Sequence, residues 1–295
     1  MSEVFILKGS PVAERIRQRA ALESARLKQA GLVPQMVSIL SPRAADARLY
    51  ADSQKRACEK VGITYGERPL LPEFKQDDLL RIISQLNEDP GVTGIFIHTP
   101  LPSGMDLAEA RRMMDPEKDV ECVHPINMGA LVSGTFEIGP CTAAAVVEMM
   151  KESGAPIEGA NAVIVGRSPA VGRSVALMLL AEKKGATVTV CHSATSDLAA
   201  ETRKGDFLVA AIGKPGFIKG GMIKAGAVVI DVGTNMVTDA AGESRLVGDV
   251  DFESAKPKCR AITPVPGGVG PVTVAFLLWN IAVRAGAALR RKAGT

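Results

Sequence analysis

The sequence has little net charge and no paired cysteines, and each absence argues against a class of protein. Across 295 residues the formal net charge is only +3 and no basic run stands out, so we expect no nucleic-acid partner. None of the five cysteines belongs to a CxxC pair, which argues against a zinc site and a disulfide framework; no metal is expected. We expect buried thiols in a reducing compartment at Cys58, Cys122, Cys141, Cys191 and Cys259.

Long apolar segments are also missing from the pattern. Residues 1–8 lack the apolar core of a secretory signal, and we find no apolar run long enough to cross a bilayer. A cytoplasmic protein without a membrane partner is therefore expected. The composition, 46% hydrophobic and 23% charged, is ordinary for a globular protein, and the length favours two domains over one.

Short β-rich runs alternate with helical patterns, which predicts the α/β class with a central, mostly parallel sheet. In the first half we expect strands at 36–40, 63–65 and 94–99, and helices at 12–29, 44–61, 76–87 and 107–114. In the second half we expect a helix at 142–152, strands at 162–165, 187–191, 207–211 and 228–231, and a last helix at 272–289. The loop-like stretch 134–140 separates a domain 1–139 from a domain 140–271.

A glycine turn between a strand and a helix start occupies Val163–Arg173. Such a turn directs backbone N–H groups at an anion, and Gly166, Arg167, Ser168 and Gly172 are the candidate contacts for a dinucleotide pyrophosphate. The spacing is looser than GxGxxG, so a purely structural turn would look the same. Its position at the first strand–helix junction of a βαβ series favours nucleotide binding.

The end of the next strand indicates which nucleotide is preferred. NAD-binding domains usually place Asp or Glu there, whereas this chain has Cys191-His192-Ser193. Ser193 can donate a hydrogen bond to a 2′-phosphate, and Arg167 can neutralise that phosphate. We therefore expect NADP rather than NAD as the cofactor, with His192 as a surface residue at the strand end rather than a ligand.

Further motifs carry a family resemblance that extends in order from about Gly9 to Ala275. They are Pro100-Leu101-Pro102, Lys118-Asp119-Val120, His124–Gly129, Pro140-Cys141-Thr142, Gly213-Lys214-Pro215-Gly216, Val247-Gly248-Asp249-Val250 and Pro264–Thr273. Together they closely resemble the methylenetetrahydrofolate dehydrogenase/cyclohydrolase family. The resemblance implies a homodimer whose N-terminal and Rossmann NADP-binding domains form a cleft, with the last helix, 272–295, packing back on the first domain.

The resemblance also implies where the ligands bind. The folate is expected against Tyr50, the loop of Pro100 and Leu101, and the loop from Pro264 to Thr273. The remaining substrate contacts implied by the family pattern are Glu121, Gly267 and Gly268. The remaining cofactor contacts, several of them near the nicotinamide, are Thr142, Gly213, Thr234, Gly270 and Thr273.

Departures from the family pattern gather on the folate side. Gln54 stands four residues after Tyr50, where the pattern has a lysine. Lys55 does not replace that lysine, because position i+5 is rotated by about a further 100° around a helix. His98 replaces an expected glutamine and Glu121 an expected aspartate. We take Tyr50, Gln54 and His98 as the candidate catalytic residues, and three changes around one pocket indicate altered chemistry.

The two reactions of the family differ in what they require. Hydride transfer from 5,10-methylenetetrahydrofolate to nicotinamide needs two well-positioned reactants and no proton movement. Hydrolysis of the methenyl product needs a titratable group, which Gln54 does not provide. We therefore predict an NADP-dependent dehydrogenase of one-carbon metabolism whose cyclohydrolase activity is weak or absent. Two alternatives stay open: a bifunctional enzyme with His98 as a relocated base, and a non-catalytic NADP-binding regulatory protein.

Overall fold

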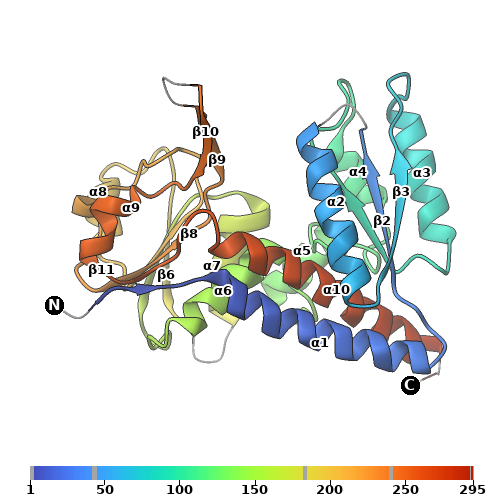
Figure 1. Cartoon of the computed structure of the whole chain (residues 1–295), viewed down its shortest axis with the longest axis horizontal. Coiled ribbons are helices and arrows are strands. Elements are labelled where there is room, and N and C mark those ends of the chain that lie inside the picture. The colour runs from blue at the N-terminus through green and yellow to red at the C-terminus, as the bar shows by residue number, and fades with distance from the viewer. Residues whose placement is uncertain (1–2, 42–44, 182–184, 239–241, 293, 295) are drawn as a thin grey trace. The chain divides into compact units, whose positions relative to one another are not determined.

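Contacts divide the chain into two compact units (Figure 1). The computed structural model describes residues 3–41, 45–181, 185–238, 242–292 and 294. Unit 1 comprises Met1–Glu14, Leu131–Thr135 and Gly139–Thr273, and unit 2 comprises Arg15–Ala130, Phe136–Ile138 and Val274–Thr295. The division expected from the sequence placed residues 1–14 in the other domain. They group with unit 1 because strand β1 (Phe5–Ile6) pairs in parallel with β11 (Cys259–Ile262).

Unit 1 contains a six-stranded parallel sheet in the order β1-β11-β8-β7-β5-β6. The four predicted strands are confirmed as β5 (Asn161–Val165), β6 (Thr187–Cys191), β7 (Phe207–Ala210) and β8 (Ala227–Asp231). From β5 the chain first adds β6 on one side and then β7 on the other. In doubly wound sheets, ligands bind outside the carboxyl ends of the strands at such a reversal.

Short helices and one hairpin complete unit 1. The longest helix that lies entirely in this unit, α6 (Cys141–Glu152), buries a run of alanine, valine and methionine side chains. After β5 come the π-helical turn Pro169–Arg173 and α7 (Ser174–Ala181). The other elements are α8 (Leu198–Thr202), the 3-10 turns Gly220–Met222 and Lys256–Lys258, α9 (Phe252–Ala255), and the antiparallel strands β9 (Asn235–Thr238) and β10 (Ser244–Val247).

Unit 2 contains the parallel sheet β3-β2-β4, formed by Thr64–Pro69, Gln35–Leu40 and Gly94–Ile97. Because side chains alternate along a strand, each strand sends half of its residues to each face. One face packs its isoleucines and Val37 against α3 (Gln76–Glu88) and α4 (Leu107–Met113). The other face carries Phe96 and lies against α2 (Ala45–Lys60), whose predicted first residue, Ala44, lies outside the described residues.

Two long helices, α1 (Gly9–Gln29) and α10 (Val269–Lys292), have residues in both units. Within unit 2, the α10 residue Asn280 donates from Nδ2 to the backbone oxygen of Val120 at 2.9 Å. Helix α10 corrects one expectation, because it is long and apolar enough to cross a membrane by composition alone. Of its most apolar window 56% is buried inside the protein, as in the core helix of a globular domain. The five cysteines are all buried free thiols, as predicted.

Candidate active site

Helix α2 places Tyr50 and Gln54 one turn apart on the face that covers the unit 2 sheet. The Tyr50 ring packs 6.1 Å from the Phe96 ring and edge-on, at 5.8 Å, against the imidazole of His98. Tyr50 keeps 38% of its surface exposed, whereas Gln54 is fully buried. Neither Oε1 nor Nε2 of Gln54 has a hydrogen-bond partner among the described residues. A buried amide left in this state costs about 1–3 kcal/mol for each unpaired group, so it calls for an explanation.

His98 directly follows β4 and is also buried, with 3% of its surface exposed. Its Nε2 lies 3.3 Å from Oγ of Ser38 on the neighbouring strand β2, and its ring lies 4.7 Å from Phe96. Burial, together with the positive charge of Arg48, lowers the pKa of His98 to about 4. The imidazole is therefore neutral near pH 7. At that pH His98 is a poor proton acceptor, which weighs against the alternative in which His98 acts as the base.

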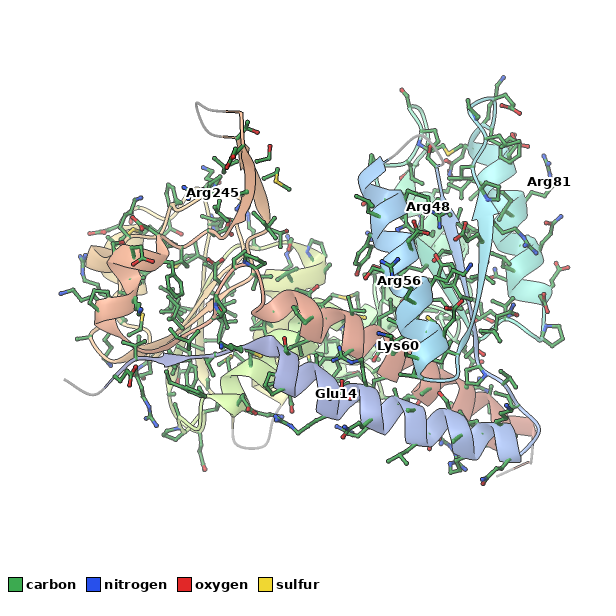
Figure 2. The ribbon with its side chains drawn as sticks, viewed as in Figure 1. Glu14, Arg48, Arg56, Lys60, Arg81 and Arg245 are labelled. Atoms are coloured by element: carbon green, nitrogen blue, oxygen red, sulfur yellow. The ribbon has the colours of Figure 1, made fainter. Side chains whose placement is uncertain are left out.

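A cluster of charges lies on α2 beside this polar group. Figure 2 shows Arg48, Arg56 and Lys60 succeeding one another along the helix. Arg48 donates to both carboxylate oxygens of Glu67 on β3, each at 2.7 Å, and also to Asp52. These two carboxylates raise the pKa of Arg48 above its usual value. Arg48, the cation whose charge acts on His98, is therefore paired with carboxylates. It does not replace the lysine of the family pattern.

Glu121 lies beside the carboxyl end of β4. A parallel bridge joins Ile95 to Asp119, and the Ile95 N–H donates to the Lys118 oxygen at 2.8 Å, so Glu121 follows at the level of the strand end. Burial of the Glu121 side chain raises its pKa to about 7; the charge of Arg111 opposes this rise and the charge of Asp119 adds to it. Among the sequence-predicted site residues of unit 2, this carboxyl is the one that titrates near neutral pH.

The neighbours of Glu121 in the sequence have structural partners. Asp119 accepts hydrogen bonds from the backbone N–H of His124 at 2.7 Å and from Asn127 at 2.8 Å, which fixes the start of α5 (Pro125–Ser133). Cys122 adopts a positive φ of 58°, which is uncommon for a residue with a side chain. The family motif around these residues therefore holds Glu121 in a constrained loop.

The loop after β4 carries the other predicted substrate contacts of unit 2. The Thr99–Pro100 peptide bond is cis, Pro100 is exposed, and Leu101 packs against the core formed by β2, β4 and α3. The structure thus places the Tyr50 ring against His98, with Gln54 one helical turn from Tyr50 and Pro100 two residues after His98 in the chain. The roles assigned to these residues stay predictions.

In unit 1, a cavity of about 340 Å³ opens at the carboxyl ends of β5, β6 and β7, where the sheet order reverses. We call it the nucleotide pocket. Its lining residues are Val165, Gly166, Arg167, Ser168, His192, Ser193, Leu198, Ala211, Ile212, Lys214 and Phe217. Four of the predicted cofactor contacts, Gly166, Arg167, Ser168 and Ser193, are therefore brought together, as expected for a strand–turn–helix phosphate site.

Two glycines allow this turn to form. Gly166 has a φ of +128°, and a Cβ there would lie 2.2 Å from the backbone oxygen of Ala211. A Cβ on Gly172 would lie 2.0 Å from the oxygen of Gly166. Both positions exclude larger residues, so Gly172 supports the turn from behind while Gly166, Arg167 and Ser168 line the pocket.

The chemistry of the nucleotide pocket fits a dinucleotide with an additional phosphate. Its lining contains no carboxylate, and β6 is followed by His192 and Ser193 rather than by Asp or Glu. His192 accepts the Ala194 N–H on Nδ1 at 3.1 Å, so in the neutral ring the proton is on Nε2. The pocket includes His192, which sequence analysis had set aside as a surface residue.

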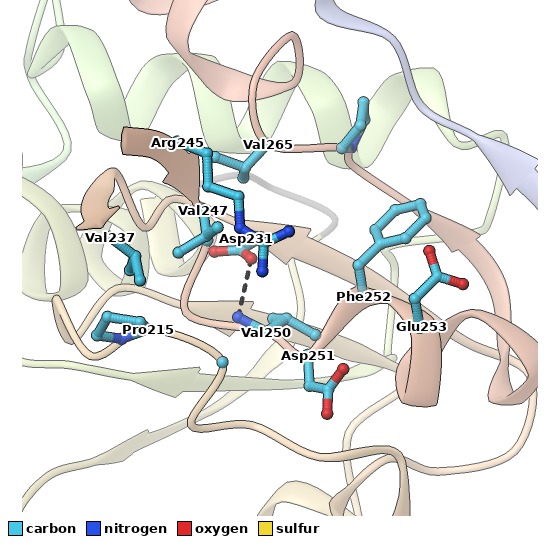
Figure 3. Close-up of a pocket in the computed structure, with 13 residues that line it drawn as sticks. Pro215, Asp231, Val237, Arg245, Val247, Val250, Asp251, Phe252, Glu253 and Val265 are labelled. Atoms are coloured by element: carbon cyan, nitrogen blue, oxygen red, sulfur yellow. Dashed lines mark hydrogen bonds between the residues drawn. The ribbon is translucent and has the colours of Figure 1, made fainter. Parts of the chain in front are cut away.

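Two buried aspartates, missed as site residues in the sequence, organise the loops beside this pocket. Asp231, at the end of β8, accepts from the backbone N–H groups of Gly233, Asp249 and Val250, each at 2.9 Å (Figure 3). Asp249 in turn accepts from Ile212 at 2.7 Å and Gly213 at 3.0 Å. Burial raises the pKa of Asp231 to about 6. The sequence signal for Asp231 was its position as the one charged residue at the end of the otherwise apolar strand β8.

The remaining predicted contacts of unit 1 lie on loops and helix starts. Gly213 belongs to the loop held by Asp249, and Thr234 is exposed just before β9. Thr142 lies in the first turn of α6, and Gly270 and Thr273 lie in the first turns of α10. Gly267 accepts the Gly9 N–H at 2.8 Å, and Pro264 lines a second cavity, of about 510 Å³, beneath the β9–β10 hairpin (Figure 3). Gly268 is buried.

A parallel, doubly wound sheet with a phosphate turn at its order reversal defines the class of dinucleotide-binding α/β proteins. Sequence comparison then specifies the family. Residues 140–288 match the NAD(P)-binding domain of tetrahydrofolate dehydrogenase/cyclohydrolase, and residues 7–121 match the catalytic domain of the same family. The chain therefore belongs to the tetrahydrofolate dehydrogenase/cyclohydrolase family.

Individual relatives agree with this assignment. A bifunctional protein FolD of Moorella thermoacetica is 48% identical over 276 residues, which cover 93% of this chain and 96% of that protein. The methylenetetrahydrofolate dehydrogenase-cyclohydrolase of Trypanosoma brucei, solved with NADP and an inhibitor, is 38% identical with a TM-score of 0.91, covering 98% of this chain and 100% of that one. A 5,10-methylenetetrahydrofolate dehydrogenase of the silkworm Bombyx mori is 34% identical with a TM-score of 0.86, covering 99% and 100%.

Proposed function

We propose that this chain is an NADP-dependent 5,10-methylenetetrahydrofolate dehydrogenase whose cyclohydrolase activity is weak or absent. The observation that carries the proposal is Gln54, a buried amide without partners where the family pattern has a lysine. Relatives of this chain are named both as bifunctional proteins and, in the silkworm, as a dehydrogenase. We also propose, from family resemblance, a cytoplasmic homodimer that acts on a tetrahydrofolate derivative.

Cofactor preference is supported by the nucleotide pocket. Its lining has no carboxylate to repel a 2′-phosphate, and it offers the Arg167 guanidinium and the Ser193 hydroxyl. The backbone turn at Gly166 and Ser168 would hold the pyrophosphate. When bound, NADP⁺ supplies the hydride-accepting nicotinamide ring. The protein's contribution to that step is to position the two reactants and exclude water.

On the folate side, the arrangement of unit 2 meets the needs of hydride transfer. Tyr50 offers a half-exposed ring held in place by Phe96 and His98. The Gln54 amide has no exposed surface, so of these two α2 residues it is Tyr50 that can contact a pterin-type ring. Glu121, with its raised pKa, can bind the ring as donor or acceptor. None of these contacts requires a proton to move during the reaction.

Hydrolysis of the methenyl product would require one of these groups to move protons. Gln54 does not titrate near neutral pH, and the neutral, buried His98 is already bonded to Ser38. The bifunctional alternative therefore requires His98 to act as a base despite its lowered pKa, or another proton carrier to replace it. Glu121 has a pKa suited to proton transfer near neutral pH, so the experiments below also test Glu121 as a proton carrier.

Changing Gln54→Lys tests the proposal. We expect wild-type protein to reduce NADP⁺ with methylenetetrahydrofolate but to consume methenyltetrahydrofolate at no more than about twice the buffer rate. The variant should gain hydrolysis by about two to four orders of magnitude, the usual contribution of a positioned acid–base group. Absorbance decay of the methenyl compound measures this gain. Lys55→Gln, at the adjacent exposed position of α2, is the matched control and should change neither activity.

Three other results would contradict the proposal. Fast methenyl hydrolysis by wild type that disappears in Glu121→Gln would assign the proton transfer to Glu121 and establish a bifunctional enzyme. The same loss in His98→Gln would establish the His98 alternative. NADP⁺ binding without any turnover or folate binding would instead establish a non-catalytic NADP-binding protein.

A further inference from the structure

The nucleotide pocket contains a second cation that the proposed function has not used. Lys214, on the loop after β7, lines the same cavity as Arg167 and Ser193. Its side chain is exposed, and within the described residues no carboxylate lies at ion-pair distance from it or from Arg167. Two unpaired cations around one cavity without a lining carboxylate create a strongly anion-attracting site.

The loop that presents Lys214 is held rigidly from behind. The Lys214 N–H donates to Oδ1 of the buried Asp249 at 2.8 Å, and Asn235 donates to the same oxygen at 2.9 Å. The backbone of Asp249 is in turn fixed by Asp231. The Lys214 ammonium group lies 5.3 Å from the ring centroid of Phe217, close enough for a cation–π contact. This preorganisation reduces the entropy lost when the ammonium group binds a ligand.

Charge balance indicates which part of the ligand needs this cation. The pyrophosphate of a dinucleotide is held by backbone N–H groups at the turn of Gly166 and Ser168. A 2′-phosphate near the end of β6 carries close to two negative charges at neutral pH. Arg167 balances one of these charges, and the Ser193 hydroxyl balances none. One negative charge therefore needs a further partner.

We propose that Lys214, together with Arg167, binds the 2′-phosphate and so determines the preference for NADP over NAD. The inference rests on the proposed NADP-dependent function. It predicts that binding of a 2′-phosphorylated adenosine depends on Lys214, whereas binding of its counterpart without that phosphate does not. Because charge–charge attraction is screened by salt, the Lys214 contribution should also shrink as ionic strength rises.

The test measures binding of two fragments to the full chain by calorimetry. Adenosine 2′,5′-bisphosphate carries the extra phosphate, and 5′-AMP lacks it. For Lys214→Gln we expect the Kd of the bisphosphate to rise about tenfold, as for the loss of one charge-assisted contact, with 5′-AMP unchanged. Lys214→Arg should recover most of the affinity. Lys219→Gln removes an exposed lysine of the same loop that pairs with Asp251 at 3.1 Å outside the pocket, and it should change neither Kd.

Turnover adds a second readout. The KM for NADP⁺ should rise about tenfold in Lys214→Gln with kcat unchanged, and the KM for NAD⁺ should stay constant. Equal weakening of both fragments would place Lys214 on the other phosphate and overturn the inference, as would no effect on either fragment. Fragment binding needs no folate. A failure of the proposed dehydrogenase function would therefore appear separately, as bisphosphate binding intact in a protein that does not reduce NADP⁺.

Discussion

Three polar side chains of unit 2 are buried or half-buried and have unpaired atoms or a shifted pKa. Gln54 is fully buried with an unpaired amide, His98 is held neutral against Ser38, and Glu121 has a pKa of about 7. Groups in this condition concentrate at functional sites, because an ordinary core would replace them with apolar residues or pair them. At the scale of residues, the candidate site is therefore marked by buried polar groups that cost folding free energy, as well as by its family motif.

Glu121 provides a residue-scale prediction on stability. Its pKa of about 7 lies above the ordinary 4.5, so between these values the folded protein retains a proton that the unfolded chain has released. The free energy of unfolding is therefore greatest below pH 4.5, falls as the pH rises from 4.5 to 7, and levels off above pH 7. We expect Glu121→Gln to raise the free energy of unfolding by up to about 3 kcal/mol at pH 8, and to change it little at pH 4.

Urea unfolding at the two pH values measures this difference. Glu73→Gln, an exposed position of the same unit, is the control and should behave alike at both values. Destabilisation of Glu121→Gln at pH 8 would show instead that the carboxylate is charged and paired in the folded protein.

Secondary-structure elements were well predicted where their patterns are long. The helices α2 and α3 follow from their helical pattern, the strands β5 to β8 follow from short continuous apolar runs, and the phosphate turn follows from its glycines. Strand β1 was missed because it has only two residues, and β11 because Arg260 interrupts its short apolar run. Helix α10 begins at Val269 rather than at residue 272, because Pro271 is tolerated in the first helical turn, where N–H groups have no intrahelical partner.

Lys118 gives the element-scale prediction. The sequence identified it only as part of a family motif, but its ammonium group donates to the backbone oxygens of Leu86, Asn87 and Asp89 at 2.7, 2.7 and 2.6 Å. It thereby satisfies the free carbonyl groups at the end of α3. We expect Lys118→Met to lower the free energy of unfolding by about 2 kcal/mol.

Amide hydrogen exchange locates the effect of that substitution. Exchange should accelerate in the last turn of α3 and remain unchanged in β5 to β8 of unit 1. Arg81→Met, an exposed α3 residue paired with Asp78 at 3.0 Å, is the control and should cost less than about 1 kcal/mol. A uniform rise in exchange across both units would contradict the capping role.

At the scale of the whole molecule, the two compact units are each assembled from separate stretches of the chain, whereas the sequence predicted a single division between residues 139 and 140. Residues 1–14 belong with unit 1 through the pairing of β1 with β11, and residues 274–292 of α10 belong with unit 2. The first of these groupings depends on a pairing between two strands that lie far apart in the sequence. The local sequence pattern of one strand does not show which distant strand it pairs with, so the pairing of β1 with β11 could not be predicted.

The central claim, hydride transfer without hydrolysis, is tested most directly by the folate products of one reaction. Wild-type protein is supplied with 5,10-methylenetetrahydrofolate and NADP⁺, and the folates are separated at neutral pH while NADPH is quantified. We predict one methenyltetrahydrofolate for each NADPH at early times, with its ring-opened hydrolysis product forming only at the buffer rate. Hydrolysis product that accumulates in step with NADPH would contradict this account.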